Sequence, residues 1–135
     1  MYKTILISIL ALAFIGGFLF FYKPKPEWEA RSDDQANVTV TVTPFVLSID
    51  SKEWKFDIVL NTHSVELDQD MTKISILVDD GGKEYNAVRW EGGEPGGHHR
   101  EGVLVFNSIS PVPEFITLKI MGIALVERNF TWQLQ

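Results

Sequence analysis

The chain has 135 residues, with 18 acidic and 12 basic side chains, a formal net charge of −6 at pH 7, and no cysteine. An acidic surface repels phosphate backbones, so we expect no nucleic acid partner. The lack of cysteine excludes disulfides, thiolate metal ligands and a cysteine nucleophile, so an exported domain would depend on its apolar core for stability.

The chain begins with an uncharged apolar segment, residues 4–22. A helix of that length rises at 1.5 Å per residue and approaches the roughly 30 Å thickness of a bilayer's hydrocarbon core. A signal peptide would instead need a shorter apolar run followed by a small-x-small cleavage site, and the one such triplet, Ala11-Leu12-Ala13, lies inside the run. We expect residues 1–22 to be an uncleaved transmembrane anchor, with a cleaved signal peptide as the alternative. The lipid bilayer is then a partner through residues 4–22.

The orientation of this anchor depends on its flanking charges. Lys3 precedes the apolar run, and Lys23 and Lys25 follow it, so the positive-inside rule is nearly balanced. The short amino-terminal stub and the acidic remainder favour a stub inside and a domain outside. The sequence therefore predicts a single-pass protein of the cytoplasmic membrane, with its C-terminal domain outside the cytoplasm.

Residues 23–36 begin with prolines at alternate positions, Pro24 and Pro26, and continue with charged side chains. Such a composition favours an extended polar linker. The remaining residues, 37–135, are numerous enough for one domain with its own core.

From Asn37 onward the apolar residues recur with a period of two, which is typical of β-strands. The pattern predicts strands at 38–43, 45–49, 54–61, 73–78, 83–90, 102–106, 115–120 and 126–134. A hairpin turn is expected at 79–82, where two glycines can adopt positive φ angles. Arg128 interrupts the apolar phase of the last strand. We expect an all-β, immunoglobulin-like β-sandwich of 7–8 strands, preceded by one N-terminal transmembrane helix.

The most unusual segment is residues 91–102, which hold five of the ten glycines and two adjacent histidines. Long connections without regular structure often bind a partner. We expect an interaction loop here for an envelope protein partner, formed by Trp90, Glu94, His98, His99 and Arg100.

The histidines also suggest a metal site, because neutral imidazoles bind Zn²⁺ and Cu²⁺. His63, His98 and His99 are the only three histidines. Neighbouring side chains on an extended backbone point to opposite faces, so a site would combine His63, one loop histidine and a carboxylate such as Glu94 or Glu101. The alternative is histidines that bond the turn or face solvent.

A string of motifs resembles a group of small uncharacterised prokaryotic membrane-anchored envelope proteins. These motifs are Trp54-x-Phe56, Thr62-His63-Ser64-Val65-x-Leu67-Asp68, Trp90-Glu91-Gly92 and the run from Gly96 to Leu104. The similarity covers roughly residues 52–132. It implies a β-sandwich outside the membrane and carries no substrate. Asn61 stands where that group would be expected to have an aspartate.

Other motifs fail. A helical calcium loop starting at Asp68 would need glycine and glutamate where Lys73 and Asp79 stand. The sequence holds no nucleophile elbow, phosphate loop or His-Glu-x-x-His helix, so an envelope enzyme ranks third. The first hypothesis is an anchored extracytoplasmic domain for binding or scaffolding, without catalysis or cofactor. A Zn²⁺- or Cu²⁺-binding envelope protein is the alternative.

Overall fold

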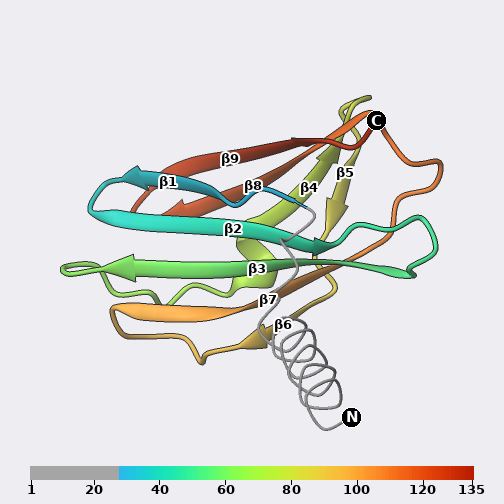
Figure 1. Cartoon of the computed structure of the whole chain (residues 1–135). Coiled ribbons are helices and arrows are strands. Elements are labelled where there is room, and N and C mark those ends of the chain that lie inside the picture. The colour runs from blue at the N-terminus through green and yellow to red at the C-terminus, as the bar shows by residue number, and fades with distance from the viewer. Residues whose placement is uncertain (1–27) are drawn as a thin grey trace, which may run out of the picture.

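The computed structural model describes residues 28–135, which form two antiparallel sheets packed against each other (Figure 1). The five-stranded sheet contains, in spatial order, β1 (Arg31–Gln35), β2 (Val38–Val46), β3 (Glu53–Thr62), β7 (His99–Asn107) and β6 (Arg89–Gly92). The four-stranded sheet contains β5 (Glu84–Asn86), β4 (Ser75–Asp79), β8 (Phe115–Ile123) and β9 (Val126–Gln133). The predicted all-β architecture is confirmed, with nine strands in this part of the chain instead of seven or eight.

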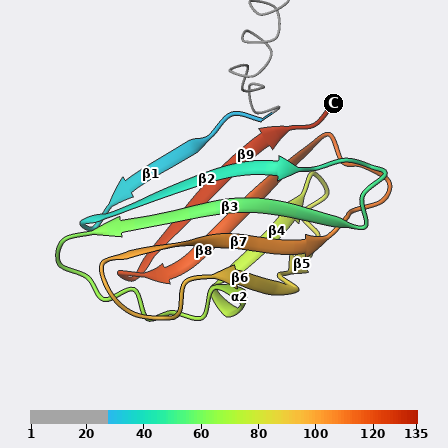
Figure 2. The same ribbon diagram turned by 60° about the horizontal axis from the view of Figure 1, so that its bottom comes forward.

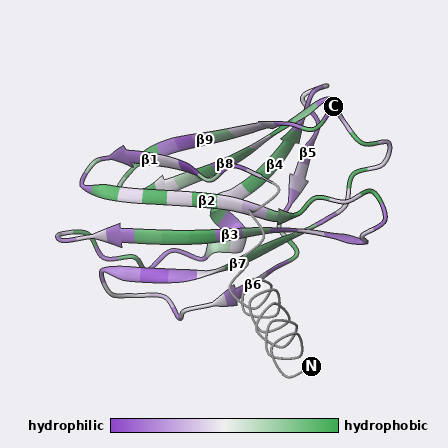
Figure 3. Ribbon diagram, in the orientation of Figure 1, coloured by the Kyte–Doolittle hydropathy of each residue, from purple (hydrophilic) through white to green (hydrophobic). Residues whose placement is uncertain are grey.

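The core lies between the sheets, where alternate residues of each strand point inward. β2 contributes Val38, Val40 and Val42, which are fully buried. Phe56 of β3 joins the layers, because its ring centroid lies 5.8 Å from that of Trp132 on β9. Figure 2 shows the strands of one sheet crossing those of the other at an angle. Figure 3 shows hydrophobic residues recurring along β2, β3 and β4, as a two-sided core requires.

The domain begins earlier than predicted. Residues 31–35, expected in the linker, form β1 and pair with β2 from Arg31↔Val42 to Gln35↔Val38. Upstream of this strand, the carbonyl of Glu29 accepts a hydrogen bond from Trp132 Nε1 at 2.8 Å. The strand was missed because its sequence is polar and charged, a composition that protects an exposed sheet edge.

The predicted anchor and the first residues of the predicted linker lie outside the described residues. Within residues 28–135, no helix is long and apolar enough to cross a membrane.

Two predicted strands differ in detail. Residues 71–74 form a helical turn, α2 (Met71–Ile74), which is capped by Asp70 Oδ1 accepting from Thr72 N–H at 3.0 Å. The strand expected from residue 73 therefore begins at Ser75. The strand expected at 83–90 divides into β5 and β6, which belong to different sheets. The sequence pattern could not show that the chain passes from one sheet to the other here, because polar and aromatic residues alternate in the same way in both short strands.

Candidate binding site

A hollow lies at one end of the five-stranded sheet, where the β1–β2 turn, the end of β3 and the start of β7 meet. In Figure 1 this is the end that carries the turn between β1 and β2. Its volume is about 610 Å³. The side chains that line it are polar and include every histidine of the chain: Asp34, Asn37, Thr39, Asn61, Thr62, His63, Ser64, His98 and His99.

Strand pairing explains why residues so far apart in sequence meet here. β3 and β7 are antiparallel, and Asn61 pairs with His99 at the last position of their register. His63 follows β3 and His98 precedes β7, so the two lie beside the same sheet end. The N–H of Thr62 donates to the carbonyl of His98 at 2.9 Å and extends this pairing by one bond. The structure thus brings His63, His98 and His99 to one hollow, as the metal hypothesis required.

The floor of the hollow is held by the hydroxyl of Thr62, which is buried. It donates to the carbonyl of Asn37 at 2.7 Å and accepts from the N–H groups of Ser64 and Val65, each at 3.2 Å. One side chain therefore fixes the β1–β2 turn to the end of β3. Thr62 supports the site and has little capacity left for a ligand.

His99 is engaged by neighbours on both sides of its ring. Nδ1 bonds Oδ1 of Asn61. Nε2 lies 3.5 Å from Oε2 of Glu101, which is on the same face of β7 two residues later. Because Oδ1 of Asn61 is occupied by His99, its amide nitrogen remains as a donor at the wall of the hollow.

The predicted metal site of His63, His98, His99 and Glu101 is not assembled. Within residues 28–135, no group of three or more histidine or carboxylate side chains is placed to hold an ion. Neither Glu94 nor Glu101 lines the hollow. The carboxylate of Glu101 lies beside His99 on the outer face of the sheet. The other ring nitrogen of His99 is hydrogen-bonded to Asn61, so both ring nitrogens already have neighbours.

The predicted interaction loop needs a correction at Arg100. This side chain is only 3% exposed, because β7 begins at His99 and turns Arg100 toward the interior. Its Nη1 donates to the carbonyl of Gln69 at 2.6 Å and its Nε to that of Gly93 at 2.9 Å. Burial lowers the pKa of Arg100 below its ordinary value. Arg100 ties the loop to the α2 connection and is not free to contact a partner.

Trp90 is also partly a core residue. It packs against the buried cluster, lies beneath the guanidinium of Arg100 at 5.3 Å, and donates from Nε1 to the carbonyl of Gly93 at 3.0 Å. Gly92 and Gly102 pair beside it, and a Cβ at Gly102 would lie 2.6 Å from Trp90 Cζ2. These glycines make room for the indole, a role that the sequence analysis missed when it treated the segment as a loop.

The rest of the glycine-rich segment is fixed to the connection after β3. The N–H of Gly97 donates to Oε1 of Glu66 at 2.7 Å, and the N–H of Gly96 donates to the carbonyl of Leu67 at 2.8 Å. Of the predicted interaction residues, Glu94 is exposed outside the hollow, and His98 and His99 line it. Of the predicted loop, only His98 and His99 therefore contribute to the hollow at the sheet end.

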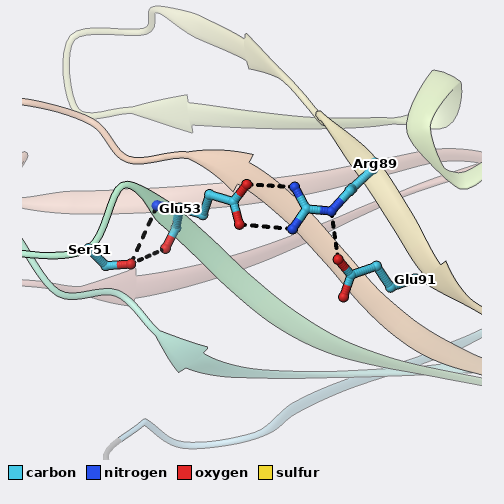
Figure 4. Close-up of polar contacts among 4 residues, drawn as sticks. All are labelled: Ser51, Glu53, Arg89 and Glu91. Atoms are coloured by element: carbon cyan, nitrogen blue, oxygen red, sulfur yellow. Dashed lines mark hydrogen bonds and ion pairs between the residues drawn. The ribbon is translucent and has the colours of Figure 1, made fainter.

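An ion-pair network lies on the outer face of the same sheet, at the end away from the hollow. Arg89 of β6 donates to both carboxylate oxygens of Glu53 on β3, at 2.5 and 2.8 Å, and to Glu91 at 2.6 Å (Figure 4). The guanidinium holds the pKa of Glu53 below its ordinary value. The network passes across β7, where Val105 pairs with Arg89 and is fully buried although it lies on the outward face. The network thus lies at the start of β3, and the hollow lies at the end of the same strand.

Six lining residues were not among the predicted site residues: Asp34, Asn37, Thr39, Asn61, Thr62 and Ser64. Asp34 was placed in the linker, because β1 was not recognised. Asn61, Thr62 and Ser64 could have been found from the sequence, because they lie next to His63, a candidate ligand, and within or beside the motif that contains it.

No family model and no curated protein matches this chain. Among solved structures, it is similar to MPT63, a secreted protein from Mycobacterium tuberculosis, with a TM-score of 0.42 and 12% sequence identity. The similarity covers 82% of this chain and 99% of that chain. A likeness at this level carries no implication for activity, ligand or location.

Proposed function

We propose that this protein is a single-pass membrane protein that displays an immunoglobulin-like β-sandwich outside the cytoplasm for binding or scaffolding, without catalysis. The hollow at the end of the five-stranded sheet is its binding site. The apolar run at residues 4–22 supports the anchor, and the cysteine-free two-sheet core supports a self-sufficient domain beyond it.

The observation that carries the binding role is the convergence of nine polar residues from three separate segments on one hollow. Its volume of about 610 Å³ falls in the range of small-ligand sites. The network of Thr62 and the pairing of Asn61 with His99 hold its walls in place. A preformed site loses less conformational freedom when it binds.

Single-cysteine labelling tests the topology, because the chain has no cysteine of its own. We would introduce Gln135→Cys in one variant and Tyr2→Cys in a matched control, which keeps all three flanking lysines. In intact spheroplasts, a membrane-impermeant maleimide should label the first and spare the second, and detergent should make both reactive. Labelling at position 2 alone, or recovery of the full-length chain in a soluble fraction, would refute the proposal.

Photo-crosslinking tests the binding role. A photoreactive amino acid replaces Ser64 in the hollow or, as a control, Asn86 on β5 at the edge of the other sheet. The proposal expects an envelope adduct specific to position 64. Equal adducts at both positions, or none at either, would count against the hollow as the binding site.

Metal binding is a second candidate because all three histidines line one hollow, and it would require these side chains to move, since no group of three ligands is assembled within residues 28–135. The full-length protein in detergent would be heated with Zn²⁺ and with Cu²⁺. A melting temperature that rises in the wild type and not in His63→Ala or His98→Ala/His99→Ala would support it. An unchanged melting temperature in all three proteins removes the metal hypothesis.

A further inference from the structure

We propose that the hollow binds a neutral polyhydroxylated ligand, that is, a saccharide. This inference rests on the proposed binding function and names the ligand class of the same site. It follows from which hydrogen-bonding groups the fold leaves available, which charges line the hollow, and how firmly its walls are held.

Several polar side chains around the hollow have no hydrogen-bond partner in the described part of the chain. Within residues 28–135, the carboxamide of Asn37, the hydroxyl of Ser64 and the imidazole of His63 make no side-chain hydrogen bond, and neither does the imidazole of His98. The amide nitrogen of Asn61 is also available, because His99 occupies only its oxygen. This mixture presents donors and acceptors side by side. A sugar hydroxyl both donates and accepts, so it can use such a wall fully.

The charged groups around the hollow are few. No lysine or arginine lines the hollow, and Asp34 is its one carboxylate. Phosphate and carboxylate ligands are held by arginine, lysine or helix N-termini, none of which is present among these lining residues. A metal ion lacks a group of three ligands within residues 28–135. The lining contains no large apolar side chain, so an apolar ligand would gain little from burial here.

Hydrogen bonds within the protein hold parts of the hollow's wall in place. Oδ1 of Asp34 accepts from the Thr39 hydroxyl at 3.2 Å, which fixes the carboxylate and leaves its second oxygen for a ligand. The side chain of Asn61 is oriented by His99, and the backbone of Asn37 is held at the β1–β2 turn, where its carbonyl accepts from the hydroxyl of Thr62. Hydroxyl recognition depends on such fixed directions, because each hydrogen bond weakens steeply when it is misaligned.

The test uses the full-length, ¹⁵N-labelled protein in lauryldimethylamine oxide, a detergent without a sugar headgroup. The probes are maltotriose, cellotriose, mannotriose and tri-N-acetylchitotriose, with sodium phosphate and ZnCl₂ as competing chemistries. At least one trisaccharide should shift the amide signals of residues 61–64 and 98–99 saturably. Phosphate alone should not.

Three variants locate the effect. Ser64→Ala removes one hydroxyl and should weaken binding by about threefold to tenfold, the range for one neutral hydrogen bond. Ser64→Tyr should block the hollow. Asn37→Gly removes a carboxamide while allowing the positive φ of 63° at that position, so it remains informative if the tyrosine variant fails to fold. Asn86→Ala, on an exposed strand of the other sheet, should leave binding unchanged.

Saturable shifts from phosphate or ZnCl₂ without any from the trisaccharides would overturn the proposal. So would silence from all four saccharides, or shifts that persist in a folded Ser64→Tyr variant. The labelling and crosslinking results separate this failure from that of the proposed function. A correctly exposed C-terminus with a position-64 adduct and no saccharide binding rejects the ligand class alone.

Discussion

The Nε atom of Arg128 lies 2.9 Å from Oδ1 of Asp33, an ion pair that joins the last strand, β9, to the first, β1. Arg128 has no solvent exposure and Asp33 has a side-chain exposure of 24%. The Nη groups donate to the carbonyls of Ile123 at 2.9 Å and Gln35 at 2.8 Å. Because β1 and β9 belong to different sheets, this guanidinium connects the two layers at one edge.

Replacing Arg128 should therefore destabilise the whole domain. Arg128→Ala removes the guanidinium donor from the carbonyls of Ile123 and Gln35 and the cation from Oδ1 of Asp33. We expect a loss of about 3–5 kcal/mol in the free energy of unfolding. The measurement is urea denaturation followed by tryptophan fluorescence. The control is Glu127→Ala, which removes an exposed ion pair with Lys119 at 3.7 Å and should cost less than about 1 kcal/mol. Similar losses in both variants would contradict the role of Arg128.

A methyl group at Gly102 should also be costly. It would lie 2.6 Å from Trp90 Cζ2 and 2.7 Å from the Cα of Gly92, so the indole must move. Gly102→Ala should lower stability by about 1–3 kcal/mol, as overpacking does, and alter the near-ultraviolet circular dichroism of the tryptophans. Gly81→Ala is the control, because its nearest neighbour, an Asp79 oxygen, lies 3.4 Å away. An unchanged spectrum in Gly102→Ala would show that the indole is not held there.

The β8–β9 turn offers a stabilising substitution. Ala124 and Leu125 both have positive φ, 53° and 59°, and Leu125 is 98% exposed. Glycine adopts this conformation without the steric penalty of a Cβ, so Leu125→Gly should raise stability by up to about 1 kcal/mol in thermal unfolding. Leu125→Ala removes the same exposed side chain and keeps the strain, so it should be neutral. A destabilised glycine variant would contradict this account.

The carboxylate of Asp57 should contribute a destabilising effect at neutral pH that is absent in acid. Burial, followed by the charge of Glu101, raises the pKa of Asp57 above its ordinary value of 3.8. The folded state therefore disfavours the ionised carboxylate, and this penalty is complete above the raised pKa and disappears below 3.8.

Asp57→Asn should consequently stabilise the protein at pH 7, by less than about 1 kcal/mol because solvent screens the site, and should have no such effect at pH 3. Denaturation at both pH values measures the difference. Asp50→Asn, on the exposed β2–β3 connection, controls for the general loss of a negative charge. A gain that is equal at both pH values would rule out the assigned cause.

The alternation of Val38, Val40 and Val42 with threonines was sufficient to predict strand composition, because inward and outward faces differ in polarity. It was not sufficient for β1, whose residues are nearly all exposed, or for Arg128, which satisfies its charge through carbonyls distant in sequence. Such partners become visible only when the pairing of β1 with β2 is known.

The candidate site was likewise predicted only in part. Composition singled out His63, His98 and His99, and the structure places all three around one hollow. Composition could not reveal that Arg100, the residue after His99, turns inward, because the predicted strand began three residues later than β7 does. The shift of a strand boundary by a few positions decides which side chains meet solvent.

The direction of β1 has a consequence for how the protein would sit at a bilayer. The chain enters the domain near Glu29 and Trp132, and β1 then runs five residues, about 17 Å, before its turn reaches the hollow. A membrane-attached segment before residue 28 would therefore join the domain at the end opposite the hollow. Attachment at that end would not by itself cover the hollow, which would stay accessible to ligands in the surrounding solution.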